Sequence, residues 1–178
     1  EMANTYFSTW KSKEVAVEAY NPAIAPKGVR VVFVEKPGAV QSVIKVIYPL
    51  ELKVGSEDAS AISVMSGIFG GAFSSRLNMN LREKNAYTYG ARGRVTANRY
   101  IGNFAAGASV RNEVTDSAVA QIFYEMNQMV ADGVTDEELS RNINFSTGKF
   151  ALALESDQTV ASFALNIQKN GLPGRYYQ

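Results

Sequence analysis

The chain contains no cysteine and no histidine among its 178 residues. Without cysteine it can form no disulfide bond, thiolate nucleophile or zinc–thiolate site, and it would suit either a reducing or an oxidising compartment. Without histidine it lacks the usual zinc ligand and the side chain that titrates closest to neutral pH. Most hydrolase mechanisms are therefore closed to this chain acting alone.

A strong net charge and long apolar runs are also lacking. The formal net charge is +1, so the whole chain exerts no strong field toward nucleic acid or an anionic membrane. No apolar run approaches the roughly 20 residues of a transmembrane helix, and the first residues lack the apolar core of a signal peptide. We expect one soluble domain with a substantial core, in the cytoplasm or the periplasm.

Strand patterns occupy two parts of the chain. Residues 29–37 and 40–49 are rich in β-branched side chains and are joined by Pro37-Gly38, which predicts a hairpin. Residues 89–97 and 101–110 predict a second pair of strands with alternating apolar positions. The positions of this pair that share one face are Phe104, Ala106, Ala108 and Val110.

Helical periodicity begins after the first strand pair. The spacing predicts a helix from an N-cap at Ser56 to the glycine pair Gly70-Gly71, which forms a bend. A second, shorter helix is predicted over residues 74–84. Its anchoring apolar residues are Leu77 and Leu81.

Three more helices are predicted toward the C-terminus. The first begins at a Thr115 cap and ends at Gly133, the second opens with the capping box of Thr135 and Glu138, and the third spans residues 157–169. The inward positions predicted for the last two are Leu139, Ile143, Phe150, Leu154, Val160, Ala164 and Ile167. Strands and helices do not alternate as in β–α–β units, so we expect an α+β fold, an antiparallel sheet with helices packed on one face.

Polar and aromatic groups gather around the glycine bend. The glycines could let backbone amides approach a phosphate, but the ending of a P-loop and the spacing of a dinucleotide fingerprint are both missing. A nucleophile at Ser74 or Ser75 would need a base, and Lys84 alone is too little to build that case. The acidic clusters elsewhere are explained as helix starts. No complete active site can be assembled from these residues.

Six basic residues lie between positions 76 and 99, opposed only by Glu83. They are Arg76, Arg82, Lys84, Arg92, Arg94 and Arg99. With Tyr87 and Tyr89 interleaved, they could form an RNA surface, but no nucleic-acid motif is present and we favour a solvated basic face. A local positive patch that faces a peptide or another acidic partner remains open.

Residues 70–90, GGAFSSRLNMNLREKNAYTYG, resemble the C-terminal, non-zinc-binding domain of the pitrilysin, insulin-degrading enzyme and mitochondrial processing peptidase family. Such domains carry a glycine-rich bend, then Ser-Arg-Leu, then Leu-Arg-Glu-Lys, and an aromatic ending near Tyr-Gly. Residues 37–42 and 172–177 are more loosely similar. The resemblance implies a processing-peptidase-like half-domain over residues 28–178, truncated at its C-terminus and preceded by an interdomain linker or arm over residues 1–27.

Members of this inverzincin metallopeptidase family pair two such domains as a clamshell. One domain binds zinc through H-x-x-E-H, and the other has lost that motif and closes over the peptide substrate. Since this chain has no histidine, it is similar to the second kind. The resemblance therefore implies that the chain binds no metal itself and that zinc lies in an H-x-x-E-H partner domain, in the same chain or in a partner subunit.

Two residues match the family's substrate-contacting positions. Arg82 and Tyr89 correspond to an arginine and a tyrosine, seven residues later, that in related enzymes reach the partner's catalytic chamber. A guanidinium can donate to a peptide carbonyl or carboxylate, and a phenol hydroxyl can donate to an oxyanion. The bend residues expected near this chamber are Gly70, Gly71, Ser74 and Ser75.

Two alternatives remain open. Arg82 could instead cap a helix end while Tyr89 packs in the sheet. The whole domain could also be a structural or chaperone-like subunit that is related to processing peptidases and has no proteolytic role.

Overall fold

The structure, a computed structural model, describes residues 2–11, 13–16, 19–21, 24 and 26–177. Its elements in chain order are α1 (Met2–Phe7), β1 (Gln41–Leu50), α2 (Ala59–Ser66), the π-helix η1 (Gly67–Gly71), α3 (Arg76–Asn78), the π-helix η2 (Met79–Lys84), β2 (Ala91–Thr96), β3 (Gly102–Arg111), the 3₁₀-helix η3 (Asn112–Val114), α4 (Thr115–Asp132), α5 (Asp136–Ala153) and α6 (Asp157–Asn170). No helix in the described part of the chain is both long and apolar enough to cross a membrane.

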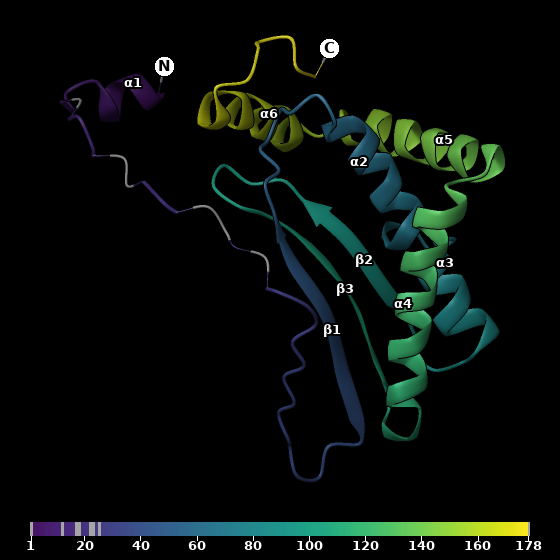
Figure 1. Ribbon diagram of the computed structural model, residues 1–178. Coiled ribbons are helices and arrows are strands. Elements are labelled where there is room, and N and C mark those ends of the chain that lie inside the picture. Colours follow the sequence, from purple (N-terminus) through teal and green to yellow (C-terminus); the bar gives the residue numbers. More distant parts are fainter. Residues whose placement is uncertain (1, 12, 17–18, 22–23, 25, 178) are drawn as a thin grey trace.

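The sheet has three antiparallel strands in the order β1-β3-β2. Side chains alternate along the central strand β3, because successive residues of a strand point to opposite faces. The predicted set is buried, namely Phe104, Ala106, Ala108 and Val110. Helices α2, α3 and α4 lie on the same side of the sheet (Figure 1). The predicted α+β fold, with an antiparallel sheet and helices on one face, is confirmed.

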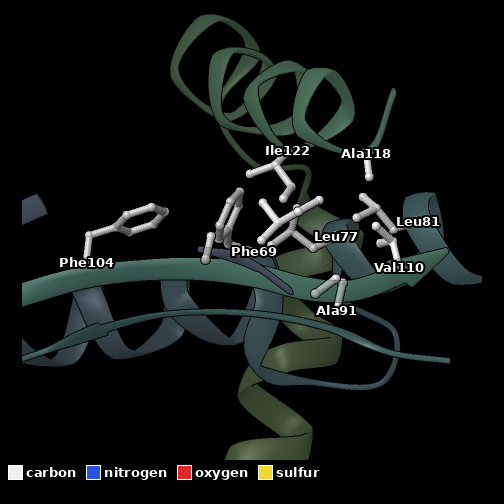
Figure 2. Close-up of a cluster of buried hydrophobic side chains, with 11 residues drawn as sticks. Phe69, Leu77, Leu81, Ala91, Phe104, Val110, Ala118 and Ile122 are labelled. Atoms are coloured by element: carbon white, nitrogen blue, oxygen red, sulfur yellow. The ribbon is translucent and has the colours of Figure 1, made fainter. Parts of the chain in front are cut away.

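One cluster of buried side chains joins this sheet to the helices (Figure 2). Leu77 of α3 and Leu81 of η2 are fully buried, as their spacing predicted, and Ile122 of α4 packs with them. Phe69 of η1 lies against Phe104, with 5.6 Å between the ring centroids. Burial of each large apolar side chain contributes about 1.5–3 kcal/mol. The short helices after the bend are therefore anchored firmly to the sheet.

The predicted hairpin in the first part of the chain is wrong. Residues 29–37 form no strand, and β1 pairs only with β3 within the described residues. The apolar side chains of this segment are exposed, Phe33 at 85%. A β-branched composition favours a strand only where a neighbouring strand and a buried face stabilise it, and this segment has neither. Residues 2–7 form the short helix α1, and parts of the predicted linker over residues 1–27 lie outside the described residues.

Two predicted helix starts are displaced. α2 begins at Ala59, because Ser56 instead begins a turn in which its carbonyl accepts from the Ala59 amide at 3.0 Å. Thr115 is the first residue of α4, where its hydroxyl donates to the Asn112 carbonyl at 2.8 Å within the preceding 3₁₀ turn. Two other predicted helix boundaries are confirmed. Gly133 ends α4 with φ of 68°, and the capping box opens α5.

The last two helices are less buried than predicted. The four predicted inward residues of α5, which are Leu139, Ile143, Phe150 and Leu154, are between 37% and 46% exposed. Val160 of α6 is exposed as well, and the core cluster includes no residue of either helix. Helical periodicity shows which side of a helix is apolar, but it does not show what covers that side. In Figure 1 both helices lie at one end of the sheet.

Two glycines allow the helical layer to approach the sheet. A Cβ on Gly70 of η1 would lie 2.1 Å from the amide nitrogen of Gly93 in β2, which no side chain tolerates. A Cβ on Gly93 would in turn lie 2.6 Å from the Phe69 ring. Neither glycine has a positive φ, so close approach is what requires them. The glycine at position 70 therefore fixes the contact between η1 and β2.

We expect Gly70→Ala to lower the free energy of unfolding by about 3 kcal/mol or more, because the added methyl group meets backbone. Gly148→Ala in α5 is the matched control. Its Cβ meets nothing within 4 Å, and it should raise stability by about 0.5–1 kcal/mol. Urea unfolding monitored by circular dichroism measures both. Equal effects of the two substitutions would contradict the close-approach account.

Candidate functional site

Arg82 lies in η2 with its side chain 37% exposed. Its guanidinium carbon lies 4.7 Å from the ring centroid of Phe73, and its Nε lies 3.4 Å from a carboxylate oxygen of Glu83. A cation–π contact of this kind contributes about 0.5–1 kcal/mol at an exposed site. Within the described residues the side chain donates no hydrogen bond to a helix carbonyl, so it is not a helix cap. Arg82 is thus held in place with donors still available.

Tyr89 lies between η2 and β2, and its side chain is 92% exposed. The backbone beside it is fixed by Thr88, whose hydroxyl donates to the Ser109 carbonyl of β3 at 2.7 Å. The Gly90 amide donates back to the same hydroxyl at 3.2 Å. The alternative in which Tyr89 packs in the sheet is therefore wrong. Its phenol hydroxyl is free to bind another molecule.

The loop that joins Arg82 to Tyr89 holds an unusual backbone conformation at Ala86. Its φ is 51°, the only positive value among the described residues other than glycine. For an alanine this left-handed conformation costs about 1–2 kcal/mol, so its surroundings must stabilise it. One stabilising contact is the guanidinium of Arg111, which donates to the Ala86 carbonyl at 2.9 Å. The sequence carries no local signal for this feature.

The predicted bend residues occupy two environments. Ser74 is exposed and lines a groove of about 290 Å³ between η1 and α5. Ser75 is buried, and its hydroxyl has no hydrogen-bond partner in the described part of the chain, so no side chain there accepts its proton. Gly70 and Gly71 end η1. Phe73, which follows them, connects the bend to Arg82 through the ring contact, a link that the sequence reasoning missed.

A bidentate ion pair ties the bend to α5. Arg76 donates from Nε and Nη2 to the two carboxylate oxygens of Glu138, both at 2.7 Å, and Nη2 also donates to the Gly133 carbonyl at 2.8 Å. Glu138 also accepts from the Thr135 amide at 2.9 Å within the capping box. The bond from Arg76 lowers the pKa of Glu138 to about 2. The same bond raises the pKa of Arg76.

The predicted basic face is divided between two sides of the sheet. Arg76 is paired on the helical side, and Arg82 contacts Glu83 and Phe73. Arg92 and Arg94 instead alternate with buried residues of β2, so they project from the opposite face. The basic residues therefore do not form one continuous surface.

The residues present do not fit a zinc site. The chain has neither histidine nor cysteine, and no group of three or more carboxylates in its described part could hold a metal ion. Zinc in proteins is held mostly by histidine nitrogen and cysteine sulfur, with carboxylates as additional ligands. The fold and the site thus define an α+β domain with an exposed arginine and tyrosine and with no zinc-binding set of residues in its described part.

The family of this domain follows from its sequence. Residues 1–145, more than half of the chain, match the family described as the peptidase M16 inactive domain. The chain belongs to this family. A comparison with curated proteins gives no match.

Solved structures share the fold. The peptidase M16 inactive domain from Pseudomonas fluorescens superposes with a TM-score of 0.70 at 21% identity, covering 76% of this chain and 32% of that one. A protease from Helicobacter pylori superposes with a TM-score of 0.71 at 19% identity, and the match covers 78% of this chain and 33% of that one. The inactive peptidase domain of a candidate zinc protease from Bordetella parapertussis superposes with a TM-score of 0.64 at 17% identity. This match covers 79% of this chain and 76% of that one. The chain thus spans about a third of the length of the first two proteins.

Stability should depend on pH through Glu138. Its pKa is lowered to about 2 in the folded chain from an ordinary value of 4.5, so its ionised form stabilises the fold above pH 4.5. This stabilisation is lost as the pH falls through 4.5 toward 2. We expect Glu138→Gln to lower the free energy of unfolding at pH 7 by about 1–3 kcal/mol, and by much less at pH 2.

Urea unfolding between pH 2 and pH 7 measures this dependence. Glu137→Gln is the control, because Glu137 is exposed and its ion pair is with Arg141, one helical turn away. Its effect should stay within about 0.5 kcal/mol. An unchanged pH profile in Glu138→Gln would rule out the ion pair as its source.

Proposed function

We propose that this domain binds and positions the peptide substrate of a zinc peptidase whose H-x-x-E-H site lies in a partner domain, in the same chain or in a partner subunit. Membership in the M16 inactive-domain family supports a partner of this kind. The observation that carries the proposal is the exposed pair of Arg82 and Tyr89, held on a fixed loop. Neither side chain belongs to the core cluster of its own domain.

Arg82 supplies the positioning contact. A guanidinium offers several N–H donors in a planar fork, which suits a peptide carbonyl or a terminal carboxylate. The Phe73 ring restricts the orientation of that fork before any peptide arrives. A side chain that is already ordered loses less conformational entropy on binding, so the contact with peptide is strengthened.

Tyr89 supplies a hydrogen-bond donor for the reaction. When a peptide carbonyl is attacked, negative charge develops on its oxygen, and a phenol hydroxyl at hydrogen-bond distance stabilises that charge. The bonds of Thr88 to β3 and of Arg111 to Ala86 hold the loop that carries this hydroxyl. One such donor typically changes turnover by about 10²–10³-fold. A domain without metal ligands can thus be necessary for catalysis.

We expect Arg82→Ala and Tyr89→Phe to lower the kcat of the complete natural enzyme toward an unfolded peptide, by about tenfold to 100-fold and by about 100-fold respectively. Both residues are outside the core, so zinc content should stay unchanged, and the melting temperature should fall by no more than about 4 °C, through loss of the Phe73 contact in Arg82→Ala. Steady-state kinetics with metal analysis measures these effects.

Arg99→Ala and Tyr100→Phe form the matched control pair. These residues are of the same types and also make a cation–π contact, at 5.7 Å, but they lie in the turn between β2 and β3. Their substitution should leave turnover unchanged. Wild-type kcat and KM in both test variants would show the assigned roles to be wrong. A zinc-loaded natural protein that cleaves no peptide would favour a structural subunit instead.

A further inference from the structure

On the face of the sheet opposite the helices the strands present four cations and no carboxylate. One of the cations, Arg111, pairs at 4.0 Å with Glu113, which follows β3. The three strands contain no aspartate or glutamate, although acidic and basic residues are nearly balanced in the whole chain. The cations on this open face are Lys45, Arg92, Arg94 and Arg111. The excess of positive charge is therefore local to the sheet, and it is present although the net charge of the whole chain is near zero.

Arg92 and Arg94 are the most available of these cations. They alternate with the buried Ala91 and Gly93, so both project from the open face. Their neighbours across the ladder are Gly107 and Ala105 of β3, which are too small to cover a guanidinium. Neither arginine has an ion-pair partner in the described part of the chain. Arg94 donates only to the Thr96 hydroxyl, at 3.1 Å.

Between these cations the open face carries small and aliphatic side chains, and the polar Gln41, Thr96 and Asn103 lie at the ends of the strands. The central strand presents Ala105, Gly107 and Ser109, and beyond it β1 presents the exposed Val43 and Ile47. The open face thus has two arginines on β2, a strip of small side chains on β3, and Val43 and Ile47 on either side of Lys45 on β1. An extended peptide matches such a surface, because its side chains can reach β1 and β2 while its backbone lies over the strip on β3.

We propose that this open face binds acidic side chains of the substrate peptide through Arg92 and Arg94, and that it makes the enzyme selective for them. The inference rests on the proposed function, since it names the chemistry of the same substrate. Guanidinium groups pair with carboxylates bidentately. Side chains two residues apart on one strand face are about 7 Å apart, which is also the spacing of alternate side chains in an extended peptide. The preferred pattern is therefore Asp-x-Asp or Glu-x-Glu.

The position of these arginines along β2 also predicts where the acidic residues lie in the substrate. Arg92 and Arg94 follow Tyr89 by three and five residues. Tyr89 itself lies in a bend before the first residue of β2, so a rise of about 3.3 Å per residue gives upper limits of about 10 Å and about 17 Å for its distances from them. We therefore expect the acidic side chains within about five residues of the scissile bond.

A peptide is favoured over RNA as the occupant of this face. Sheets that bind single-stranded RNA present aromatic side chains on which bases stack. The open face of the three strands has none. The aromatic residues of these strands, Tyr48 and Phe104, lie on the core side and stack on each other at 4.9 Å. The aliphatic Val43 and Ile47 suit a peptide instead.

Peptide binding tests the inference directly. The natural zinc-loaded protein, with the glutamate of its H-x-x-E-H motif changed to glutamine to stop cleavage, is titrated into three labelled peptides that differ at two alternate positions. These positions carry Asp, Asn or Lys. At low salt we expect the Asp peptide to bind about threefold to tenfold more tightly than the Asn peptide, and the Lys peptide to bind least tightly. Fluorescence anisotropy gives the three Kd values.

Arg92→Gln/Arg94→Gln should abolish this preference while leaving the affinity for the Asn peptide unchanged. The control Arg99→Gln/Lys149→Gln removes the same charge from exposed positions outside the open face and should keep the preference. Equal binding of the Asp and Asn peptides by the wild type would overturn the inference, as would a preference that survives in Arg92→Gln/Arg94→Gln. Displacement of the Asp peptide by an oligouridylate, lost in the same variant, would assign the face to RNA and overturn it too.

Cleavage of the Asn peptide by the unmodified zinc-loaded protein separates this inference from the proposed function. If the protein cleaves the Asn peptide but binds the Asp and Asn peptides equally, the inference is wrong and the proposed function stands. If it prefers the Asp peptide in binding but cleaves no peptide, the peptidase role is wrong and the acidic-peptide surface stands.

Discussion

The contact between two backbones, at Gly70 and Gly93, is the constraint on which the rest of the site depends. It brings η1 against β2 and directs the following helices along the edge of the sheet, where Leu77 and Leu81 reach the core. Two outward amides of β2 are satisfied by this layer, that of Ala91 donating to Asn78 at 3.2 Å and that of Val95 donating to Ser66 at 3.0 Å. The β2 edge is thereby covered by the helical layer, while the face carrying Arg92 and Arg94 stays open.

One strand therefore connects three candidate contacts with substrate. Arg82 and Tyr89 lie before its first residue, and the open-face arginines lie along it. Under the proposed function, the domain adds selectivity and stabilisation of the developing charge to a peptidase whose metal is held by a partner domain. In this proposal stability and substrate contact depend on different residues, because the ion pair of Arg76 with Glu138 ties the bend to α5, whereas the proposed contacts lie at Arg82, Tyr89 and β2.

Features that depend on local spacing could be predicted from the sequence. The alternation in β3, the paired leucines after the bend and the capping box of α5 are of this kind. Features that depend on distant partners could not. The hairpin over residues 29–37 does not form, α5 and α6 remain partly uncovered, and Arg76 pairs with a glutamate 62 positions away. The roles of Arg82 and Tyr89 rest on motif resemblance, to which the structure adds their exposure and the fixed loop between them.

The central claim is that this domain presents Tyr89 and Arg82 to a peptide at a partner domain's catalytic centre. A crystal structure of the complete natural protein with a non-hydrolysable peptide analogue bound tests it most directly. The account predicts that the Tyr89 hydroxyl lies within about 3.2 Å of the oxygen that replaces the scissile carbonyl, with Arg82 donating to the peptide beside it. A bound analogue that leaves both side chains in solvent would contradict the account.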